Sequence, residues 1–282
     1  MDQAEKLRKE AKKRKKTESK VITITSGKGG VGKSNAAVNL AVWFRKMNKK
    51  VIIFDADFGL ANVEVMFKTN PKYTLSDMIY NGVPIKNIIT KGPMDIGFIS
   101  GGSGIVALNN LTVDQLNYIL RQLNTLSDLC DILIVDTGAG ISDSVLKFVL
   151  GSPEVLVITT SEPSSITDAY SLIKALIKSN DYNKNTMIKI IANKVSSEEE
   201  GEQVYGKISA VTKEFLNEDL HYGGMIYNDN NLLKAITKQK VVSIEYPNSK
   251  SSKCYEKLAN ELVGSKVKSK GGIVSLFKFL TK

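Results

Sequence analysis

Cysteine, histidine, tryptophan and long apolar runs are all scarce in this chain of 282 residues. It contains two cysteines, Cys130 and Cys254, one histidine (His221) and one tryptophan (Trp43). Two cysteines far apart and without CxxC spacing argue against a disulfide framework and against an iron–sulfur cluster built within one chain. No run of 18 uncharged apolar residues occurs, so a membrane-spanning helix is not expected. The N-terminal residues lack the apolar segment of a secretory signal, and a reducing cytosol is therefore the expected setting.

The positive charge of the chain is confined to its two ends. The formal net charge is +10 at pH 7, and residues 1–20 and 265–282 each contribute +5. Residues 21–264 carry 25 basic and 25 acidic side chains, so the body has no net charge. A neutral body argues against a broad nucleic-acid-binding surface, whereas basic tails indicate contact with something acidic. The alternative is that the tails only keep the protein soluble.

Apolar strands alternate with amphipathic helices from residue 21 onward. The expected strands are 21–26, 50–57, 95–100, 131–138, 154–160, 187–194 and 223–228, and the expected helices include about 32–47, 112–128 and 164–178. Near-continuous apolar strands with helix-length spacers predict a doubly wound α/β fold, with a mostly parallel sheet and helices on both faces. We expect one domain over residues 21–264, flanked by helical tails. In such sheets ligands bind at the carboxyl ends of the strands.

A phosphate-binding loop of the form GxxxxGK[ST] follows the first expected strand. Its residues are Gly27, Lys28, Gly29, Gly30, Val31, Gly32, Lys33 and Ser34. Glycines let consecutive main-chain N–H groups point into one concavity, and the following helix adds the positive end of its dipole. In this motif Lys33 pairs with the β and γ phosphates, and the Ser34 hydroxyl ligates Mg²⁺. A glycine-rich turn that only caps a helix is the alternative, and the strand–loop–helix context argues against it.

Three acids stand at the ends of expected strands. Asp136 follows the apolar run 132–135, as expected for an acid that holds Mg²⁺ through a water. Asp55 and Asp57 close the second strand, and either could reach the phosphate or its attacking water. We include Asp55 with Ser34 and Asp136 as candidate metal residues. A single acid at a strand end often only caps the next helix, whereas three acids together with a phosphate loop indicate a nucleotide site.

The second lysine of the loop, Lys28, is unusual for a phosphate-binding loop. The run 28–34, KGGVGKS, resembles the deviant Walker A motif of the MinD/ParA class of ATPases, also called SIMIBI ATPases. Residues 55–62, DADFGLAN, resemble the first switch of that class, and residues 136–141, DTGAGI, its Walker B motif and second switch. The resemblance covers about residues 20–264. It implies a MinD-like P-loop NTPase fold and a Mg²⁺-dependent ATPase that dimerisation activates.

The resemblance also implies residue roles that spacing alone does not give. Lys28 is implied to cross the interface of an ATP-bound homodimer and reach the partner's phosphates. Asp57 is implied to orient the hydrolytic water, so that Lys28, Lys33 and Asp57 form the catalytic set. Asn193 is implied to recognise adenine, with main chain near Tyr227 closing over the base.

Residues 265–282 predict a basic amphipathic helix. Its apolar stripe consists of Ile273, Leu276, Phe277 and Leu280. The lysines at 266, 268 and 270 precede this stripe, a pattern typical of a helix that lies in an anionic membrane interface. We therefore expect a cytoplasmic protein associated peripherally with the inner face of the cell membrane. The alternative is a helix that packs back on the domain, and both hold if docking depends on the nucleotide state.

Residues 1–20 predict a basic arm that acts on a partner. The run 2–8, DQAEKLR, resembles the N-terminal activator segment of a subfamily of flagellar number regulators, FlhG (also YlxH or FleN). The resemblance implies docking on FlhF, the flagellar GTPase of the signal-recognition type, with Gln3 entering its active site and stimulating GTP hydrolysis. The flagellar C-ring proteins are further candidate partners. By composition alone the arm would be a solvated helix or a disordered segment.

The sequence thus predicts an ATP-dependent switch that regulates flagellar number or placement. A cell-division positioning ATPase of the MinD type shares the chemistry but leaves residues 1–20 unexplained. A DNA-partitioning ATPase of the ParA type would favour basic residues on the body, which carries no net charge. A metabolic or redox enzyme of the same fold conflicts with the cysteine count if it needs an iron–sulfur centre. No specific nucleic acid is expected as a partner.

Overall fold

A computed structural model of the chain describes residues 19–57, 62–101, 118, 122, 125–265, 272, 273 and 276. The strands are β1 (Lys20–Ser26), β2 (Val51–Ala56), β3 (Thr90–Lys91), β4 (Gly97–Ser100), β5 (Ile132–Ala139), β6 (Glu154–Thr159), β7 (Met187–Val195) and β8 (His221–Tyr227). The α-helices are α2 (Lys33–Lys46), α3 (Asn62–Phe67), α4 (Leu75–Asn81), α5 (Ile85–Ile88), α7 (Asp143–Leu150), α8 (Pro163–Ile177), α9 (Glu198–Leu216), α10 (Asn230–Thr237), α11 (Val242–Glu245) and α12 (Lys250–Gly264). Short 3₁₀ turns cover Pro93–Asp95 and Thr125–Asp128.

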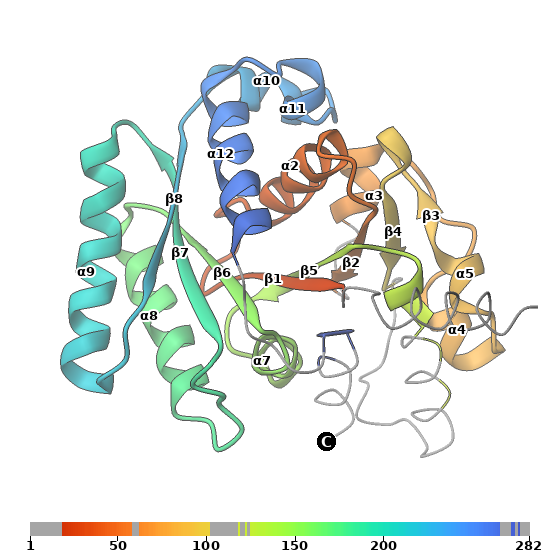
Figure 1. Cartoon of the computed structure of the whole chain (residues 1–282). Helices are drawn as coiled ribbons and strands as arrows, with labels where there is room; N and C mark the ends of the chain where they lie inside the picture. The colour runs from red at the N-terminus through yellow and green to blue at the C-terminus, as the bar shows by residue number, and fades with distance from the viewer. Residues whose placement is uncertain are drawn as a thin grey trace, which may run out of the picture.

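The strands form one eight-stranded sheet in the order β3-β4-β2-β5-β1-β6-β7-β8. All neighbouring pairs are parallel except β3 and β4, which are antiparallel. Helices cover both faces: α7, α8 and α9 lie on one side, and α2, α10, α11 and α12 lie on the other (Figure 1). The chain first builds the sheet on one side of β1, with β2 to β5, and then on the other side, with β6 to β8. The carboxyl ends of β1 and β5 lie side by side at this change of direction, which is where such folds bind ligands. The predicted doubly wound α/β fold is confirmed.

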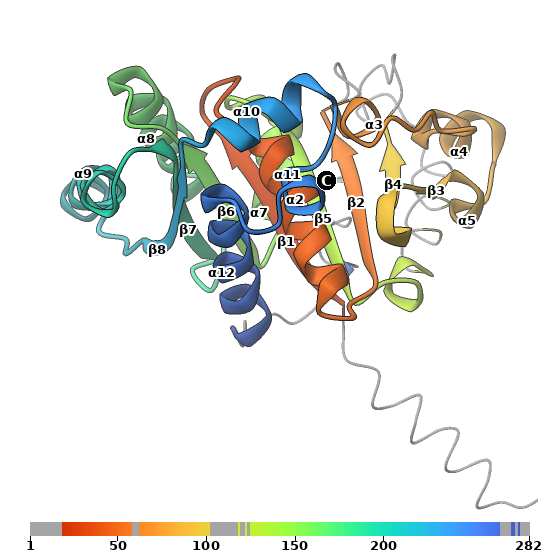
Figure 2. The same ribbon diagram turned by 90° about the horizontal axis from the view of Figure 1, so that it is seen from above.

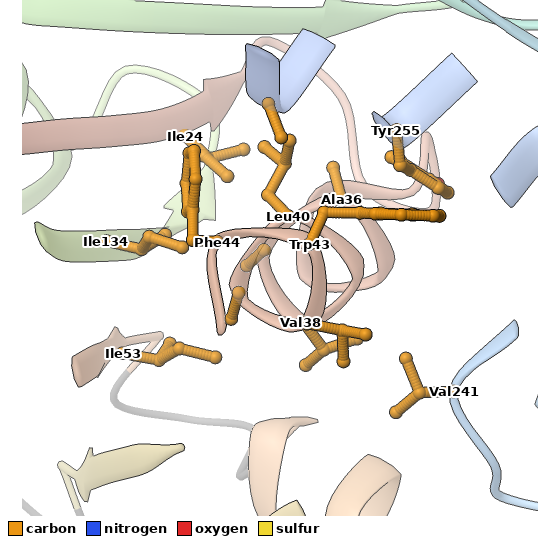
Figure 3. Close-up of a cluster of buried hydrophobic side chains, with 14 of the residues drawn as sticks. Ile24, Ala36, Val38, Leu40, Trp43, Phe44, Ile53, Ile134, Val241 and Tyr255 are labelled. Atoms are coloured by element: carbon orange, nitrogen blue, oxygen red, sulfur yellow. The ribbon is translucent and has the colours of Figure 1, made fainter. Parts of the chain in front are cut away.

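Helix α2 lies at the centre of the larger core. Ten of its fourteen residues are buried, which explains why its sequence is apolar nearly all round rather than on one stripe. Leu40 and Phe44 face β-strand residues Ile24 and Ile134, while Trp43 lies beside Tyr255 of α12 (Figure 3). This packing fixes the start of α2, and with it the phosphate loop, against the sheet.

The differences from the expected elements lie mostly at the borders of the sheet. Lys20 already belongs to β1, and β4 begins at Gly97 rather than at residue 95. The two-residue strand β3 was not expected, because a pair of residues has no periodicity to detect. Of the helix expected at 112–128, the described residues 118 and 122 are helical and residues 125–128 form a 3₁₀ turn. No helix in the described part of the chain is long and apolar enough to cross a membrane.

Ile273 and Leu276 of the C-terminal segment pack in a second apolar core, separate from the one around α2. Ile273 and Leu276 are 2% and 0% exposed, and they belong to the apolar cluster that includes Val21 and Leu133. Phe277 and Leu280 lie outside the described residues. The membrane contact expected of this stripe stays a prediction, and it requires that Ile273 and Leu276 leave the cluster.

Candidate nucleotide site

The phosphate loop joins the carboxyl end of β1 to the first residue of α2. Gly32 stands at the N-cap of α2 with φ of +102°, a left-handed conformation that favours glycine. Gly27 lies so close to α8 that a Cβ atom there would come within 2.1 Å of the Asp168 main chain. The glycines of the motif are therefore required by local backbone geometry as well as by access for phosphate oxygens.

Lys33 is almost fully buried at the start of α2, with 8% of its surface exposed. Burial lowers the pKa of its ammonium, and the nearby carboxylates of Asp136 and Asp57 partly oppose this shift. A cation in such a site is poorly solvated and binds an incoming anion strongly. Its position agrees with the predicted contact to the β and γ phosphates.

Asp136 is completely buried in β5, next to β1. Neither carboxylate oxygen accepts a hydrogen bond from the described part of the chain. Burial raises the pKa of Asp136 to about 7, although the Ser34 hydroxyl and the Lys33 ammonium both act in the opposite direction. An orphaned buried carboxylate is unusual in a native protein and points to a ligand that satisfies it.

Asp55 lies beside Asp136, because the two residues are register partners in the adjacent strands β2 and β5. The main-chain N–H groups of Asp57 and Val63 donate to its two carboxylate oxygens, each at 3.2 Å. Burial and the charge of Asp136 raise the pKa of Asp55 to about 8. Two neighbouring buried carboxylates repel each other, and a cation between them and the phosphates would relieve that repulsion.

The donor set fits Mg²⁺. Within the described ranges, no three His, Cys, Asp or Glu side chains form a metal-ligating group. A Mg²⁺ ion that binds together with phosphates needs only one or two protein carboxylates and keeps several waters. The Ser34 hydroxyl and the unsatisfied oxygens of Asp136 are ligands of the kind such an ion takes, and Asp55 is the register partner of Asp136.

Asp57 stands at the end of the second strand, outside β2 itself and partly exposed. The side-chain amide of Asn62 donates to its Oδ2 atom at 3.3 Å. Its Oδ1 atom lies 3.6 Å from where a Cβ atom on Gly138 would stand, so Asp57 borders the loop that follows Asp136. The position suits a carboxylate that contacts a water near the phosphates.

Lys28 does not point into its own phosphate loop. Its Nζ atom lies 2.9 Å from Glu162 Oε2 and 2.8 Å from Ser164 Oγ, both at the start of α8. The contact is exposed, with 37% of the Lys28 side chain and 63% of the Glu162 side chain accessible. Sequence reasoning missed Glu162 and Ser164, because a contact across more than 130 residues leaves no local pattern.

Asn193 lies near the carboxyl end of β7 and contacts the phosphate loop. Its Nδ2 atom donates to the Val31 carbonyl at 2.6 Å, and its Oδ1 atom accepts from the Lys194 N–H at 2.9 Å. The Lys194 ammonium donates to the Gly30 carbonyl at 3.0 Å, a second link that the sequence did not suggest. Recognition of adenine by Asn193 stays a prediction, and it requires that these contacts open.

Tyr227 ends β8 next to β7, and its register partner is Val195. β8 is next to β7, which holds Asn193, while β6 and β7 separate it from β1 and the phosphate loop; the predicted contact of Tyr227 with the base stays a prediction. Ile273 and Leu276 lie in the second core and not at this site. Gln3, with the rest of residues 1–18, lies outside the described residues.

Comparison with known proteins places the chain in a family. The family model ParA, described as "NUBPL iron-transfer P-loop NTPase", matches residues 17–263. The chain belongs to this ParA family of P-loop NTPases. The phosphate loop described above lies within the residues that the family model matches.

Among curated ParA-family proteins, the chain is similar to the antiactivator FleN of Pseudomonas aeruginosa. The two are 38% identical over 242 residues, which cover 86% of this chain and 85% of FleN. The flagellum site-determining protein YlxH of Helicobacter pylori is 36% identical over 275 residues, or 95% of this chain and 91% of YlxH. These similarities agree with the resemblance to flagellar number regulators.

The fold is similar to that of the septum site-determining protein MinD from Pyrococcus horikoshii, solved as a complex with Mg-ADP. The TM-score is 0.68 at 21% identity, covering 89% of this chain and all of that one. The MinD-like fold expected from the sequence is therefore confirmed.

Proposed function

We propose that the chain is an ATP-dependent dimerising switch ATPase that associates with the membrane and regulates flagellar number or placement. The observation that carries the flagellar assignment is its similarity to FleN and YlxH over nearly the whole length of each protein. The buried Lys33, the orphaned Asp136 and the neighbouring Asp55 support the ATPase chemistry. Mg²⁺ with ADP in the MinD complex supports the same nucleotide and ion here.

The residues divide the chemistry among them. Lys33 and the loop N–H groups bind the β and γ phosphates, and Ser34, Asp136 and Asp55 would hold Mg²⁺, which would supply positive charge to the phosphates. Asp57 orients the attacking water. Asn193 and the main chain near Tyr227 hold the base.

Lys28 completes the site of a second subunit. Its ammonium lies outside its own loop, on Glu162 and Ser164, so its charge is available at the surface. In an ATP-bound dimer Lys28 leaves these partners and contacts the phosphates of the other subunit. Dimerisation also releases the C-terminal stripe from the second core for contact with anionic lipid, and the N-terminal arm stimulates the flagellar GTPase FlhF.

We do not include the iron transfer named in the family's description in this proposal. An intrachain iron–sulfur cluster requires more thiolates than two, and neither Cys130 nor Cys254 belongs to a CxxC pair. Burial raises the pKa of Cys130 to about 12, which keeps it a neutral thiol. The nucleotide chemistry is retained without a cluster.

Light scattering during size-exclusion chromatography tests the switch. We expect a monomer with ADP and a dimer with ATP and Mg²⁺. Asp57→Ala should trap the dimer because hydrolysis is blocked, and Lys28→Ala should remain monomeric. An Asp57→Ala variant that stays monomeric in ATP would contradict the scheme.

Vesicle sedimentation tests the membrane association. The full chain with ATP should bind anionic vesicles but not neutral ones, and binding should fall as salt rises. Replacing the three lysines at 266, 268 and 270 by serine should weaken binding, whereas replacing exposed Lys207 and Lys213 should not. Equal binding to anionic and neutral vesicles would refute the proposed association with anionic membranes.

GTP hydrolysis by purified FlhF tests the arm. A peptide of residues 1–20 should accelerate phosphate release, and Gln3→Ala should abolish that effect while leaving the ATPase of the full chain intact. No acceleration by either peptide would leave a MinD-like ATPase without this activity.

A further inference from the structure

The last strand of the sheet, β8, forms the floor of a groove at the edge of the sheet, and Tyr227 at the end of β8 is part of its lining. The groove has a volume of about 770 Å³ and is bordered by α9 on one side and α12 on the other. Within the described part of the chain, β8 is hydrogen-bonded on one side only, by β7. Its free edge runs between the two helices (Figures 1 and 2). A free strand edge presents unpaired main-chain donors and acceptors that can pair with another extended chain.

The middle of this edge carries no side chain. Gly223 and Gly224 form a bulge there, and Gly224 has φ of +108°. A Cβ atom on Gly223 would come within 2.5 Å of the Ile191 Cδ1 atom, so a side chain there would require the Ile191 side chain to move, whereas one on Gly224 would meet nothing within 4 Å. The pair keeps the floor of the groove open to an incoming main chain.

The two walls of the groove carry opposite charges. Glu198, Glu199 and Glu202 of α9 form one wall, and Lys250, Lys253 and Lys257 of the first turns of α12 form the other, with Glu261 at the far end of α12. In the described residues no ion pair joins the walls; Lys253 pairs instead with Glu256 of its own helix. The thiol of Cys254 lies between the walls: burial raises its pKa, Glu198 adds to this shift and Lys257 opposes it.

Each wall lies on a different face of the sheet. Helix α9 packs on α8 and β7, and α12 packs on α2. Along β8, Met225 and Tyr227 contact the core under α9, while Ile226 contacts the core under α12. Successive side chains of a strand alternate between faces. A strand added to β8 therefore directs alternate side chains to the acidic wall and to the basic wall.

We propose that this groove binds an extended peptide segment in which basic and acidic residues alternate, paired with the free edge of β8. Basic side chains of the peptide contact the α9 glutamates, and the acidic ones between them contact the α12 lysines. Glu198 and Glu202 are one helical turn apart, about 6 Å along the axis, close to the distance of about 6.7 Å between alternate residues of a strand. The inference does not depend on the ATPase cycle.

Two peptides of equal composition test the alternation. One octapeptide has three lysines alternating with three glutamates between valine ends, and the other has the same residues in a lysine block and a glutamate block. In fluorescence anisotropy with the full chain, we expect the alternating peptide to bind about tenfold more tightly, because each face of the blocked peptide meets both signs of charge. Hydrogen exchange should show protection of the β8 amides by the alternating peptide.

Charge reversal of the walls gives a rescue test. Reversing one wall, with Glu198→Lys and Glu202→Lys, should weaken the alternating peptide about tenfold or more, since both walls are then basic. Adding Lys250→Glu and Lys257→Glu reverses both walls and should restore binding, because a shift of the peptide by one residue exchanges its faces. The matched control on α9 outside the groove, Lys207→Glu with Glu214→Lys, should bind like the unmodified chain.

Several results would overturn the proposal. They are equal binding of the two peptides, no binding of either, no effect of the one-wall reversal, and protection by the peptide at a place other than β8. Self-association of the chain that the peptide displaces would assign the groove to a second copy instead. Circular dichroism and ATP binding of each variant show whether the fold and the nucleotide site are intact.

Discussion

Buried carboxylates occur at both ends of the central strands, but only those at one end are neutralised. At the amino end, Glu154 is fully buried between two lysines, with Lys189 Nζ at 2.7 Å and Lys20 Nζ at 2.9 Å. At the carboxyl end, Asp136 is equally buried and accepts no hydrogen bond from the described residues. The same burial therefore serves stability at one end and ligand binding at the other.

The pKa values follow from this difference. Burial raises the pKa of Asp136 to about 7 and that of Asp55 to about 8, so the chain pays for keeping both ionised in the absence of a cation. Removing one partner of a buried ion pair is strongly destabilising, because it leaves an uncompensated buried charge. Substitutions at the amino end should therefore mainly change folding stability, whereas substitutions at the carboxyl end should mainly change nucleotide binding.

The largest effect is expected for Lys33→Ala at the ligand end. Removing a buried cation that contacts phosphate should lower ATP affinity by about 100-fold or more, while the free chain stays folded. Lys46→Ala, at the other end of α2, is the matched control and should keep normal affinity. Isothermal titration with ATP and Mg²⁺ measures the affinity of both variants. Normal binding by Lys33→Ala would show that Lys33 does not contact the phosphates.

The next effect is expected for Glu154→Gln at the opposite end. The substitution leaves Lys20 and Lys189 without their shared counter-charge, and breaking a buried ion pair in this way destabilises by about 3–5 kcal/mol. The melting temperature should fall by about 10 °C. ATP affinity of the folded variant at low temperature should be unchanged, and exposed Glu214→Gln should melt like the unmodified chain. A large loss of ATP affinity in the folded Glu154→Gln variant would contradict the separation of the two ends.

These two ends differ in how far the sequence predicts them. The phosphate loop and Asp136 are adjacent to apolar runs and form a contiguous motif, so their place at the strand ends follows from local pattern. The same runs predict the seven parallel strands. Glu154 begins such a run too, but its pairing with Lys20 and Lys189 joins three separate strands and depends on their order in the sheet. Sequence periodicity does not give that order.

The partners of Lys28 and the groove at β8 were missed for related reasons. Glu162 and Ser164 lie at the start of α8, and in the sequence this pattern indicates only that a helix begins there. Helices α9 and α12 each mix apolar and charged residues, and neither sequence alone indicates a groove. Only their packing on opposite faces of β8 brings the acidic residues of one helix near the basic residues of the other. Tertiary contacts of this kind become visible only when the fold is known.

A smaller effect, of opposite sign, is expected for Asp136→Asn. The pKa of about 7 in the folded chain lies above the ordinary value of 3.8, so the folded state binds the proton more tightly than the unfolded state. The destabilisation is then full above the folded pKa and is relieved as pH falls toward 4. Without metal, in the presence of a chelator, Asp136→Asn should melt about 4 °C higher at pH 8.

The pH dependence provides the control for this prediction. The advantage of Asp136→Asn should shrink as pH is lowered from 8 to 5, because the aspartate of the unmodified chain becomes neutral there. Asp143→Asn, a surface acid at the start of α7, should show no such trend. Melting curves in a pH series measure the difference, and a variant less stable than the unmodified chain at pH 8 would show that Asp136 is paired in the free protein.

The smallest effect on stability is expected at the exposed rim, where Lys28 contacts Glu162. Exposed ion pairs contribute little, so Glu162→Gln and Lys28→Ala should each leave the melting temperature within about 1 °C. Their effects on assembly should differ, although both remove the same contact. Glu162→Gln frees Lys28 and should form the ATP-bound dimer at lower protein concentration, whereas Lys28→Ala should not dimerise. Light scattering across a concentration series distinguishes them. If both variants dimerise alike, Lys28 acts only within its own subunit, and its contact with Glu162 is a surface ion pair of the ordinary kind.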